Sequence, residues 1–224
     1  MVSISGLTFI AKNLSERDIK DKRVLDVGSY SSSTGIRHLI ESFHPAKYVG
    51  VDVRRGNDVD IVCDTENLES KFKENSFDIV ISTEVVEHIR NWRKAISGMK
   101  HVVKPNGIIL ITTRSKGFEY HMSPQDYWRY EPEDMRKIFS DFKILKLEKD
   151  YLDPGVFVIV RKPLKFREND LSNHELYNMV AGRRARTADT EGISSAYVSG
   201  LIKAHVKLAI YKAGQFIFSR KREI

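Results

Sequence analysis

The stretch Val24–Gly28, which reads VLDVG, decides the fold. It is a short apolar run that ends in glycine, and the loop Ser29–Thr34 and a helix opened by Gly35 follow it. Similar runs rich in valine and isoleucine recur and alternate with longer amphipathic stretches. This alternation is typical of βα units whose helices cover both faces of a parallel sheet. Ligands of such sheets bind beyond the carboxyl ends of the strands, so we expect a nucleotide-like ligand beside Gly28.

The pattern predicts an α/β fold with seven strands and five helices. We expect helices at about Thr34–Ser42, Glu66–Lys73, Asn91–His101 and Pro132–Ser140, with one more before the first strand. The segment Asp153–Gly155 leaves no room for a crossover helix, so the last two strands should form an antiparallel hairpin at the end of a mostly parallel sheet. The strands are expected at Arg23–Gly28, Lys47–Asp52, Val59–Cys63, Phe77–Ser82, Gly107–Thr112, Phe142–Lys149 and Val156–Arg161.

The net charge of +7 is not spread evenly along the chain. From Arg161 onward there are 13 Lys or Arg against 6 Asp or Glu, so the last 64 residues carry the whole excess. Two helices are predicted there, at about Ser172–Arg186 and Ser194–Arg220. We therefore divide the chain into a ligand-binding domain, residues 1–162, and a basic helical C-terminal extension, residues 163–224. The extension could be a lid or homodimerisation element, a membrane-surface helix, a nucleic-acid contact or a solvated basic face.

The single cysteine, Cys63, excludes an intramolecular disulfide and a cysteine-based zinc site. The segment Met1–Lys12 lacks the basic flank and apolar core of a signal peptide, and no window approaches the roughly 20 apolar residues of a spanning helix. A cytoplasmic protein is expected, peripheral to a membrane if the basic tail meets one. No metal is expected, because metal-ligand spacing is absent around His38, His44, His101, His174 and His205.

Glycine ends the first predicted strand, and polar residues lie at the ends of the next three. Asp52 ends the second strand, 24 residues after Gly28, where a carboxylate can accept hydrogen bonds from both hydroxyls of a ribose. A solvated strand-end aspartate is the alternative. Asp64 follows the third strand and Glu84 the fourth, so these side chains should meet at one edge of the sheet.

In order and spacing, five segments resemble the class I S-adenosylmethionine-dependent methyltransferases, particularly the small-molecule group typified by ubiquinone and sugar-pathway enzymes. The resemblance spans about Lys22 to Arg161 and implies a Rossmann-like fold. The segments that carry it are Val24–Gly28, Val49–Asp52, Asp60–Asp64, Ser76–His88 and Val103–Gly107.

The resemblance implies S-adenosyl-L-methionine as the cofactor. Gly28, Ser29 and Tyr30 would lie near its methionine portion, and Asp26 would reach its amino group. Asp52, with Val53 beside it, would hold the ribose. The remaining implied contacts are Cys63, Asp64 and Thr65 for the adenine and Thr83, Glu84 and Val85 for the floor below the methyl group.

The loop Gly28–Gly35 departs from the family's glycine-x-glycine-x-glycine pattern, because it is longer and lacks the middle glycine. Serine and threonine hydroxyls could hold the cofactor carboxylate instead. Because the loop differs from the family pattern, the chain could also be a regulatory module that binds the cofactor without catalysing methyl transfer.

The segment Gly117–Tyr130 is dense in aromatic and titratable residues and resembles a segment of methyltransferases linked to cell-surface sugar or lipid pathways. This composition suits an acceptor pocket, but the aromatic side chains, Tyr127 and Trp128 among them, could equally pack against the sheet. His121 and His88 are candidate general bases, since imidazole titrates near neutral pH, and Asp126 could orient an acceptor hydroxyl. His88 could instead brace its helix.

The function predicted is O-methylation of a small or carrier-linked metabolite. An RNA or protein methyltransferase is the alternative that the basic tail favours. A nicotinamide oxidoreductase is the alternative at the level of the fold, because both families place a carboxylate after the second strand.

Overall fold

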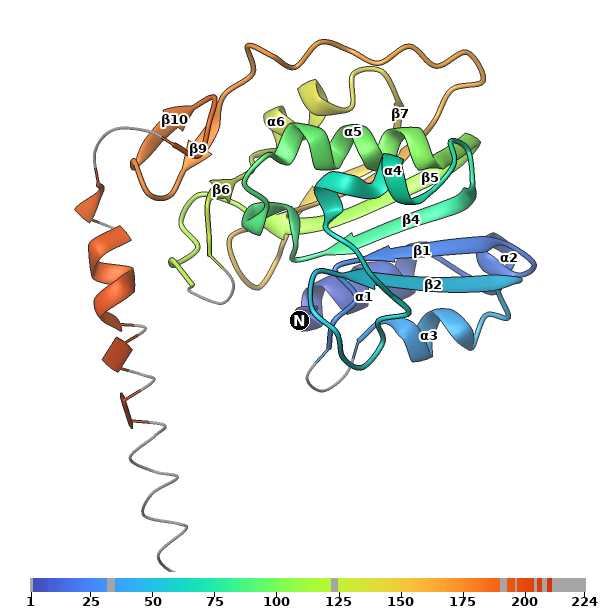
Figure 1. Ribbon diagram of the computed structural model, residues 1–224, viewed down its shortest axis with the longest axis horizontal. Helices are drawn as coiled ribbons and strands as arrows, with labels where there is room; N and C mark the ends of the chain where they lie inside the picture. Colours follow the sequence, from blue (N-terminus) through green and yellow to red (C-terminus); the bar gives the residue numbers. More distant parts are fainter. Residues whose placement is uncertain are drawn as a thin grey trace, which may run out of the picture.

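The computed structural model describes residues 2–31, 35–121, 125–189, 193–195, 197–203, 205–206 and 209–210. Its main feature is a seven-stranded sheet between two layers of helices (Figure 1). The predicted α/β fold is therefore confirmed. In spatial order the strands are β3 (Ile61–Val62), β2 (Lys47–Asp52), β1 (Arg23–Val27), β4 (Phe77–Thr83), β5 (Val103–Arg114), β8 (Gly155–Arg161) and β7 (Lys143–Lys149).

Alternate side chains of each central strand enter different cores, because successive residues of a strand point to opposite faces. In β1, Leu25 and Val27 belong to one buried cluster and Val24 to the other. The first cluster packs under α5 (Trp92–Val102) and α6 (Pro132–Ile138). The second packs under α1 (Ile4–Asn13), α2 (Glu16–Ile19) and α3 (Arg37–Glu41). Both faces are thus covered, as the apolar strands predict.

The predicted hairpin is present, but the antiparallel strand is not at the edge. Strand β8 pairs antiparallel with both β5 and β7, so it lies between them. The remaining strand pairs, β3 with β2, β2 with β1, β1 with β4 and β4 with β5, are parallel. The edge strand β7 therefore runs in the same direction as β5.

The helix predicted at Ser172–Arg186 is wrong, because this segment forms strands. Strands β9 (Leu176–Asn178) and β10 (Arg183–Ala185) join β6 (Trp128–Arg129) in a second sheet of order β10-β9-β6. Leu176 and Asn178 are buried, and Gly182 closes the β9–β10 turn with a φ of +67°. Pairing with β6 decides the conformation, since strand formation depends strongly on such neighbours.

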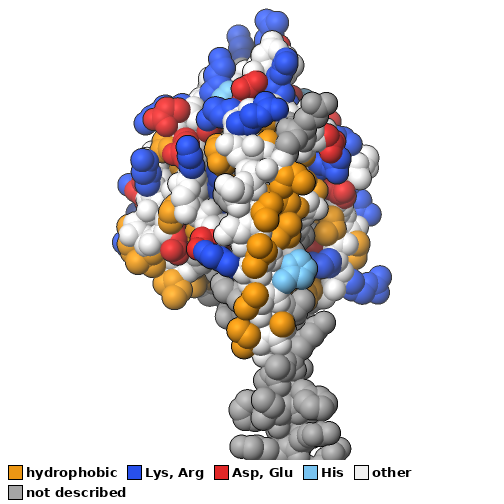
Figure 2. Space-filling view, turned by 90° about the vertical axis from the view of Figure 1, so that its left-hand side faces the viewer, with side chains coloured by type: hydrophobic (Ala, Val, Ile, Leu, Met, Phe, Trp, Pro, Cys, Tyr) orange, Lys and Arg blue, Asp and Glu red, His pale blue; other side chains and the backbone are white. Residues whose placement is uncertain are grey.

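The second predicted helix agrees with the structure where it is described. Residues 195, 197–203, 205–206 and 209–210 are helical, Ser194 is described but precedes the helix, and the rest of Ser194–Arg220 lies outside the described residues. This helix contacts the segment Phe118–His121, because the rings of Tyr197 and Tyr120 lie 4.8 Å apart. Exposed apolar side chains gather on one face of the molecule (Figure 2). The helix itself exposes Val198, Ile202, Val206 and Ile210.

No helix in the described part of the chain combines the length and apolar character needed to cross a bilayer.

Candidate active site

A cavity of about 320 Å³ opens at the carboxyl ends of β1, β2 and β4. It collects nine of the residues predicted for the site, namely Gly28, Tyr30, Asp52, Val53, Asp64, Thr65, Glu84, Val85 and His88. Three further predicted residues, Asp26, Ser29 and Thr83, line a smaller pocket that shares Gly28 and Tyr30 with the cavity. The structure therefore brings together, at the strand ends, most of the residues that the sequence predicted for the site.

Gly28 lets the backbone pass directly against the floor of the cavity. Its φ is +82°, and a Cβ added there would lie 2.1 Å from Cγ2 of Val85. A side chain at this position would meet both a strained backbone and a filled space. The peptide N–H groups of Gly28 and Ser29 both donate to the carbonyl of Val51, which fixes the loop after β1 against β2.

Asp52 lies at the end of β2 with its carboxylate held in the cavity wall. Oδ1 accepts from the backbone N–H of Arg54 at 2.8 Å, and Oδ2 lies 3.4 Å from the N–H of Tyr30. The Arg54 guanidinium stacks over the Tyr30 ring at 4.0 Å, so two loops meet beside Asp52. A carboxylate has about four lone-pair sites and can accept further hydrogen bonds from a ligand.

Asp64 and Thr65 line another part of the cavity wall. The Asp64 side chain caps the short helix η1 (Thr65–Asn67) by accepting from the N–H of Glu66 at 2.9 Å. Cys63 is buried and lies outside both groups of lining residues, with its Sγ 3.3 Å from the carbonyl oxygen of Asp64. Cys63 therefore packs behind the predicted adenine position.

Asp26 is buried and already engaged, because the hydroxyl of Tyr48 donates to its carboxyl group. Burial raises the pKa of Asp26 to about 7, and the hydrogen bond from Tyr48 opposes that rise. In the same pocket the hydroxyl of Ser29 is buried without a hydrogen-bond partner among the described residues. Ser32–Thr34 of the serine-rich loop lie outside the described residues.

His121, Asp126 and Arg129 form a connected polar group beside the cavity. Nδ1 of His121 lies 2.9 Å from Oδ2 of Asp126, and Arg129 donates to both Asp126 oxygens at 2.5 and 2.6 Å. Burial alone would raise the pKa of Asp126, but the hydrogen bonds from Arg129 and His121 lower it to about 2. The ionised carboxylate therefore accepts a hydrogen bond from Nδ1–H, so the lone pair of the neutral His121 ring is on Nε2.

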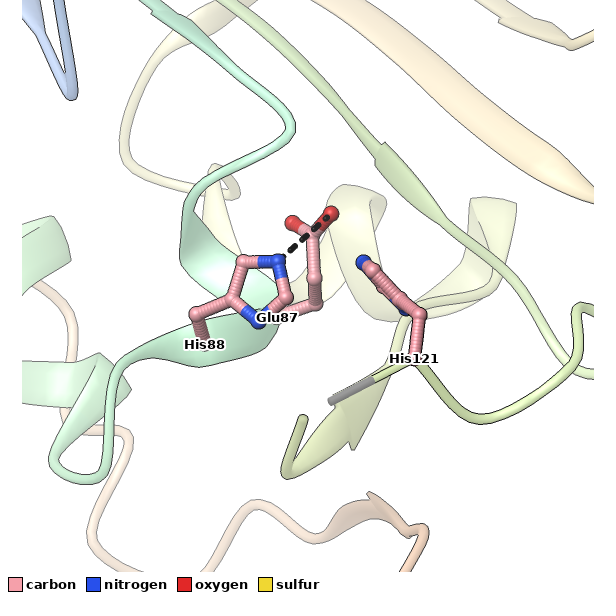
Figure 3. A group of neighbouring side chains, drawn as sticks. All are labelled: Glu87, His88 and His121. Atoms are coloured by element: carbon pink, nitrogen blue, oxygen red, sulfur yellow. Dashed lines mark ion pairs between the residues drawn. The ribbon is translucent and has the colours of Figure 1, made fainter. Parts of the chain in front are cut away.

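His88 connects this group to the cavity, which it lines. Its ring centroid lies 4.6 Å from that of His121, and its Nδ1 is 3.0 Å from the carbonyl oxygen of Gln125 (Figure 3). Burial lowers the pKa of His88 to about 4, and the neighbouring His121 adds to this effect. Neutral His88 with a protonated Nδ1 likewise presents a free Nε2.

Two glutamates near the end of β4 are buried, and one of them, Glu84, lines the cavity. Glu84 accepts from the hydroxyl of Thr112 at 3.0 Å and pairs with Arg114, and burial raises its pKa to about 7. Glu87 is fully buried and accepts from the hydroxyl of Thr113 at 2.8 Å, and burial also raises its pKa. Glu84 belongs to the predicted site. Glu87 lies in the segment Ser76–His88 that carries the family resemblance, but the sequence predicted no role for it.

Several site residues were missed from the sequence. Arg129 lies in the segment Gly117–Tyr130, and its spacing of three from the predicted Asp126 was the available signal. Tyr127 also lines the cavity, and the aromatic-rich segment Gly117–Tyr130 was the signal for it. No local pattern pointed to the other lining residues that were missed, because the loops that carry them meet only in the folded chain. These residues are Arg54, Glu66, Ile89 and Arg90.

Comparison with known proteins agrees with this geometry. Residues 7–151 match the family model described as a methyltransferase domain. A phthiotriol/phenolphthiotriol dimycocerosates methyltransferase of Mycobacterium ulcerans (strain Agy99) is 30% identical over 107 residues, which cover 42% of this chain and 38% of that protein. A mitochondrial ubiquinone biosynthesis O-methyltransferase of Dictyostelium discoideum is 27% identical over 139 residues, covering 51% of this chain and 42% of that protein. The chain thus spans about two fifths of the length of these relatives.

Solved structures share the fold. The 1,6-didemethyltoxoflavin-N1-methyltransferase of Burkholderia thailandensis, solved with bound S-adenosylhomocysteine, superposes with a TM-score of 0.53 at 12% identity, over 64% of this chain and 72% of that one. At this identity the likeness concerns the fold alone. The family match covers more than half of the chain and confirms the family that the sequence resembles and the cofactor that the resemblance implies. The chain therefore belongs to the class I S-adenosylmethionine-dependent methyltransferases.

Proposed function

We propose that this chain transfers a methyl group from S-adenosylmethionine to an oxygen atom of a small or carrier-linked acceptor, of sugar-like or lipid-like chemistry. The observation that carries the proposal is the chain of contacts from Arg129 through Asp126 to His121, beside a cavity-lining His88. An imidazole whose Nδ1 is held by an ionised carboxylate is suited to act on a hydroxyl through Nε2. An acceptor nitrogen would have less need of such a base.

The residues of the cavity fit the cofactor. Asp52 offers carboxylate oxygens to the two ribose hydroxyls, and Asp64 with Thr65 offers polar atoms to the adenine. Gly28 gives the close backbone approach. The hydroxyl of Ser29, which has no hydrogen-bond partner among the described residues, can replace contacts of the missing middle glycine. The bound cofactor supplies a methyl group on a positively charged sulfur.

The chain's own residues then bind the acceptor, orient it toward the methyl group and exclude water. Methyl transfer requires an in-line approach of the acceptor oxygen, so positioning supplies much of the rate increase. In this proposal Val85 and Glu84, which line the cavity, form the floor below the methyl group. His88, which also lines it, and the neighbouring His121 are the groups proposed to take the proton of the acceptor hydroxyl. Asp126 keeps His121 in the required tautomer.

We assign to the C-terminal extension the role of a lid over the acceptor side of the cavity. Strand β9 pairs with β6, which directly follows Asp126 and Tyr127. The ammonium of Lys203 on the following helix lies 2.7 Å from Glu119, and Tyr197 packs on Tyr120. These contacts tie the extension to the segment that carries His121. The exposed apolar side chains of the same helix would suit a second copy of the chain or a membrane surface.

The test is a methyl-transfer assay with S-adenosylmethionine labelled on the methyl carbon. Quinols, sugar derivatives and lipid-linked phenols serve as acceptors, each beside an analogue in which the hydroxyl is replaced by hydrogen. We expect label in an O-methyl product, one S-adenosylhomocysteine for each methyl transferred, and none with the analogue. Label on nitrogen would contradict oxygen as the acceptor atom. Tight cofactor binding without transfer to any acceptor would favour a regulatory module.

A further inference from the structure

We propose that Glu87, His88 and His121 bind a divalent transition-metal ion. One ligand atom of each residue, a carboxylate oxygen or an imidazole nitrogen, lies within 4.8 Å of the other two. Figure 3 shows the two imidazole rings and the Glu87 carboxylate converging on a common space. Glu87 and His88 lie in the short helix η2 (Val86–His88), which follows β4, whereas His121 lies in the loop after β5.

The second nitrogen of each imidazole is held as in known metal sites. Nδ1 of His88 lies 3.0 Å from the carbonyl oxygen of Gln125, and Nδ1 of His121 lies 2.9 Å from the Asp126 carboxylate. Metal-binding histidines usually donate their other N–H to a backbone carbonyl or a carboxylate in this way. Both Nε2 atoms are therefore lone-pair donors, and neither has a hydrogen bond to a residue in the described ranges.

Glu87 supplies an independent observation that points to a ligand. Its side chain is fully buried, Oε2 accepts from Thr113, and Oε1 has no hydrogen-bond partner among the described residues. Oε1 lies 3.9 Å from Nε2 of His88, too far for a hydrogen bond between them. A buried carboxylate oxygen without a partner is costly, and a cation at the common point of the three ligands would remove that cost.

The ligand set selects the kind of ion. Two imidazole nitrogens with one carboxylate suit Zn²⁺ or another first-row ion, whereas Mg²⁺ and Ca²⁺ prefer oxygen ligands. Ligands about 2.0 to 2.1 Å from a tetrahedral ion lie about 3.3 Å from one another, so the site must close somewhat on binding. His121, with 36% of its side chain exposed, is the ligand with room to move.

Three protein ligands leave one position of a tetrahedral ion open. His88 lines the cavity, so the open position would face the acceptor. With the ion bound, Nε2 of His88 and of His121 is occupied, so the ion would take the place of an imidazole base. It would lower the pKa of the acceptor hydroxyl, whose proton leaves to solvent. The S–CH3 bond then breaks as the O–CH3 bond forms, and the electron pair stays on sulfur. This role rests on the proposed function, but binding of the ion does not.

The experiment is calorimetric titration of ZnCl2 into the full chain after treatment with a chelator, without cofactor or acceptor. The variants are His121→Ala, His88→Ala and Glu87→Gln, whose amide oxygen can still accept from Thr113. The matched control is His38→Ala, because His38 is an exposed histidine on α3. Thermal unfolding without metal verifies the fold of each variant, and the exposed position of His121 keeps one ligand variant usable in any case.

We expect one saturable zinc site in the native chain and in His38→Ala, unaffected by excess Mg²⁺. Each ligand variant should bind zinc at least about 100-fold more weakly, since even outer-sphere changes cost about 10- to 100-fold. Absence of saturable binding, or equal affinity in the ligand variants, would overturn the proposal. Zinc binding without any cofactor binding would instead count against the proposed function alone.

Discussion

Two buried aspartates of this chain have opposite electrostatics, and the difference follows from their partners. Asp126 faces the guanidinium of Arg129, which lowers its pKa to about 2 in spite of burial. Asp26 has the neutral hydroxyl of Tyr48, so burial prevails and its pKa rises to about 7. Asp126 is consequently an anion that orients His121, whereas Asp26 is largely neutral below pH 7 in the free protein.

Replacing His121 should separate chemistry from cofactor binding. His121→Ala removes the imidazole next to Asp126 but no residue of the cofactor cavity, so the dissociation constant for S-adenosylmethionine should stay unchanged. Turnover should fall by about 10²- to 10⁴-fold, the usual contribution of such a group. Calorimetry and single-turnover assays measure the two effects. Full turnover in the variant would remove His121 from the mechanism.

Asp26 predicts a pH dependence of stability. Its folded pKa of about 7 lies above the usual value of 3.8, so the folded state binds more protons between these values. The contribution of Asp26 to stability is therefore fully present below about pH 4 and is lost as the pH rises through 7. In the native chain this loss amounts to at most about 1.4 kcal/mol of unfolding free energy per pH unit. The Asp26→Asn variant should not show it. Urea unfolding of both proteins at pH 5 and pH 8 measures it, and a pH-independent difference would contradict the assignment.

Asp52 tests the ribose contact. Asp52→Ala should weaken S-adenosylmethionine binding by more than about tenfold, or about 1.4 kcal/mol, because it removes two hydrogen-bond acceptors from the cavity wall. Asp153→Ala, at an exposed aspartate in the β7–β8 connection, is the matched control and should bind normally. If the affinity of a folded Asp52→Ala protein equals that of the control, the carboxylate does not hold the ribose.

At the scale of elements, the sequence pattern predicted correctly those strands whose own residues determine their conformation. The strand Lys47–Asp52 was predicted with the bounds observed, because its apolar run is continuous and ends in a carboxylate. Strands β9 and β10 were missed, since three residues each carry too little periodicity to be distinguished from a helix. Their conformation depends on β6, about 50 residues earlier in the chain.

Asn178 should hold this second sheet together. Its Oδ1 accepts from the N–H of Ala181, and its Nδ2 donates to the carbonyls of Thr187 and Ala188. Asn178→Ala leaves these groups unpaired, at a cost of about 1 to 3 kcal/mol. Amide hydrogen exchange in β9 and β10 should become at least about tenfold faster, with β1 and β4 unchanged. Tyr177→Phe is the control in the same strand. Unchanged protection in Asn178→Ala would show that the second sheet does not depend on this side chain.

At the scale of the molecule, the site has two parts that differ in how far they can be predicted. The cofactor side follows from the strand order β3-β2-β1-β4, which puts successive strand ends next to one another. The acceptor side depends on a loop that folds back, where the N–H of Tyr127 donates to the carbonyl of Glu87. No periodicity encodes this return, so the meeting of His88 with His121 required the structure.

The most direct test of the central claim is calorimetric titration of the purified chain with S-adenosylmethionine, S-adenosylhomocysteine and NAD in separate experiments. The cavity formed by Gly28, Asp52 and Asp64 predicts saturable binding of the first two ligands and none of NAD. Binding of NAD alone, or of none of the three by a folded protein, would contradict the account.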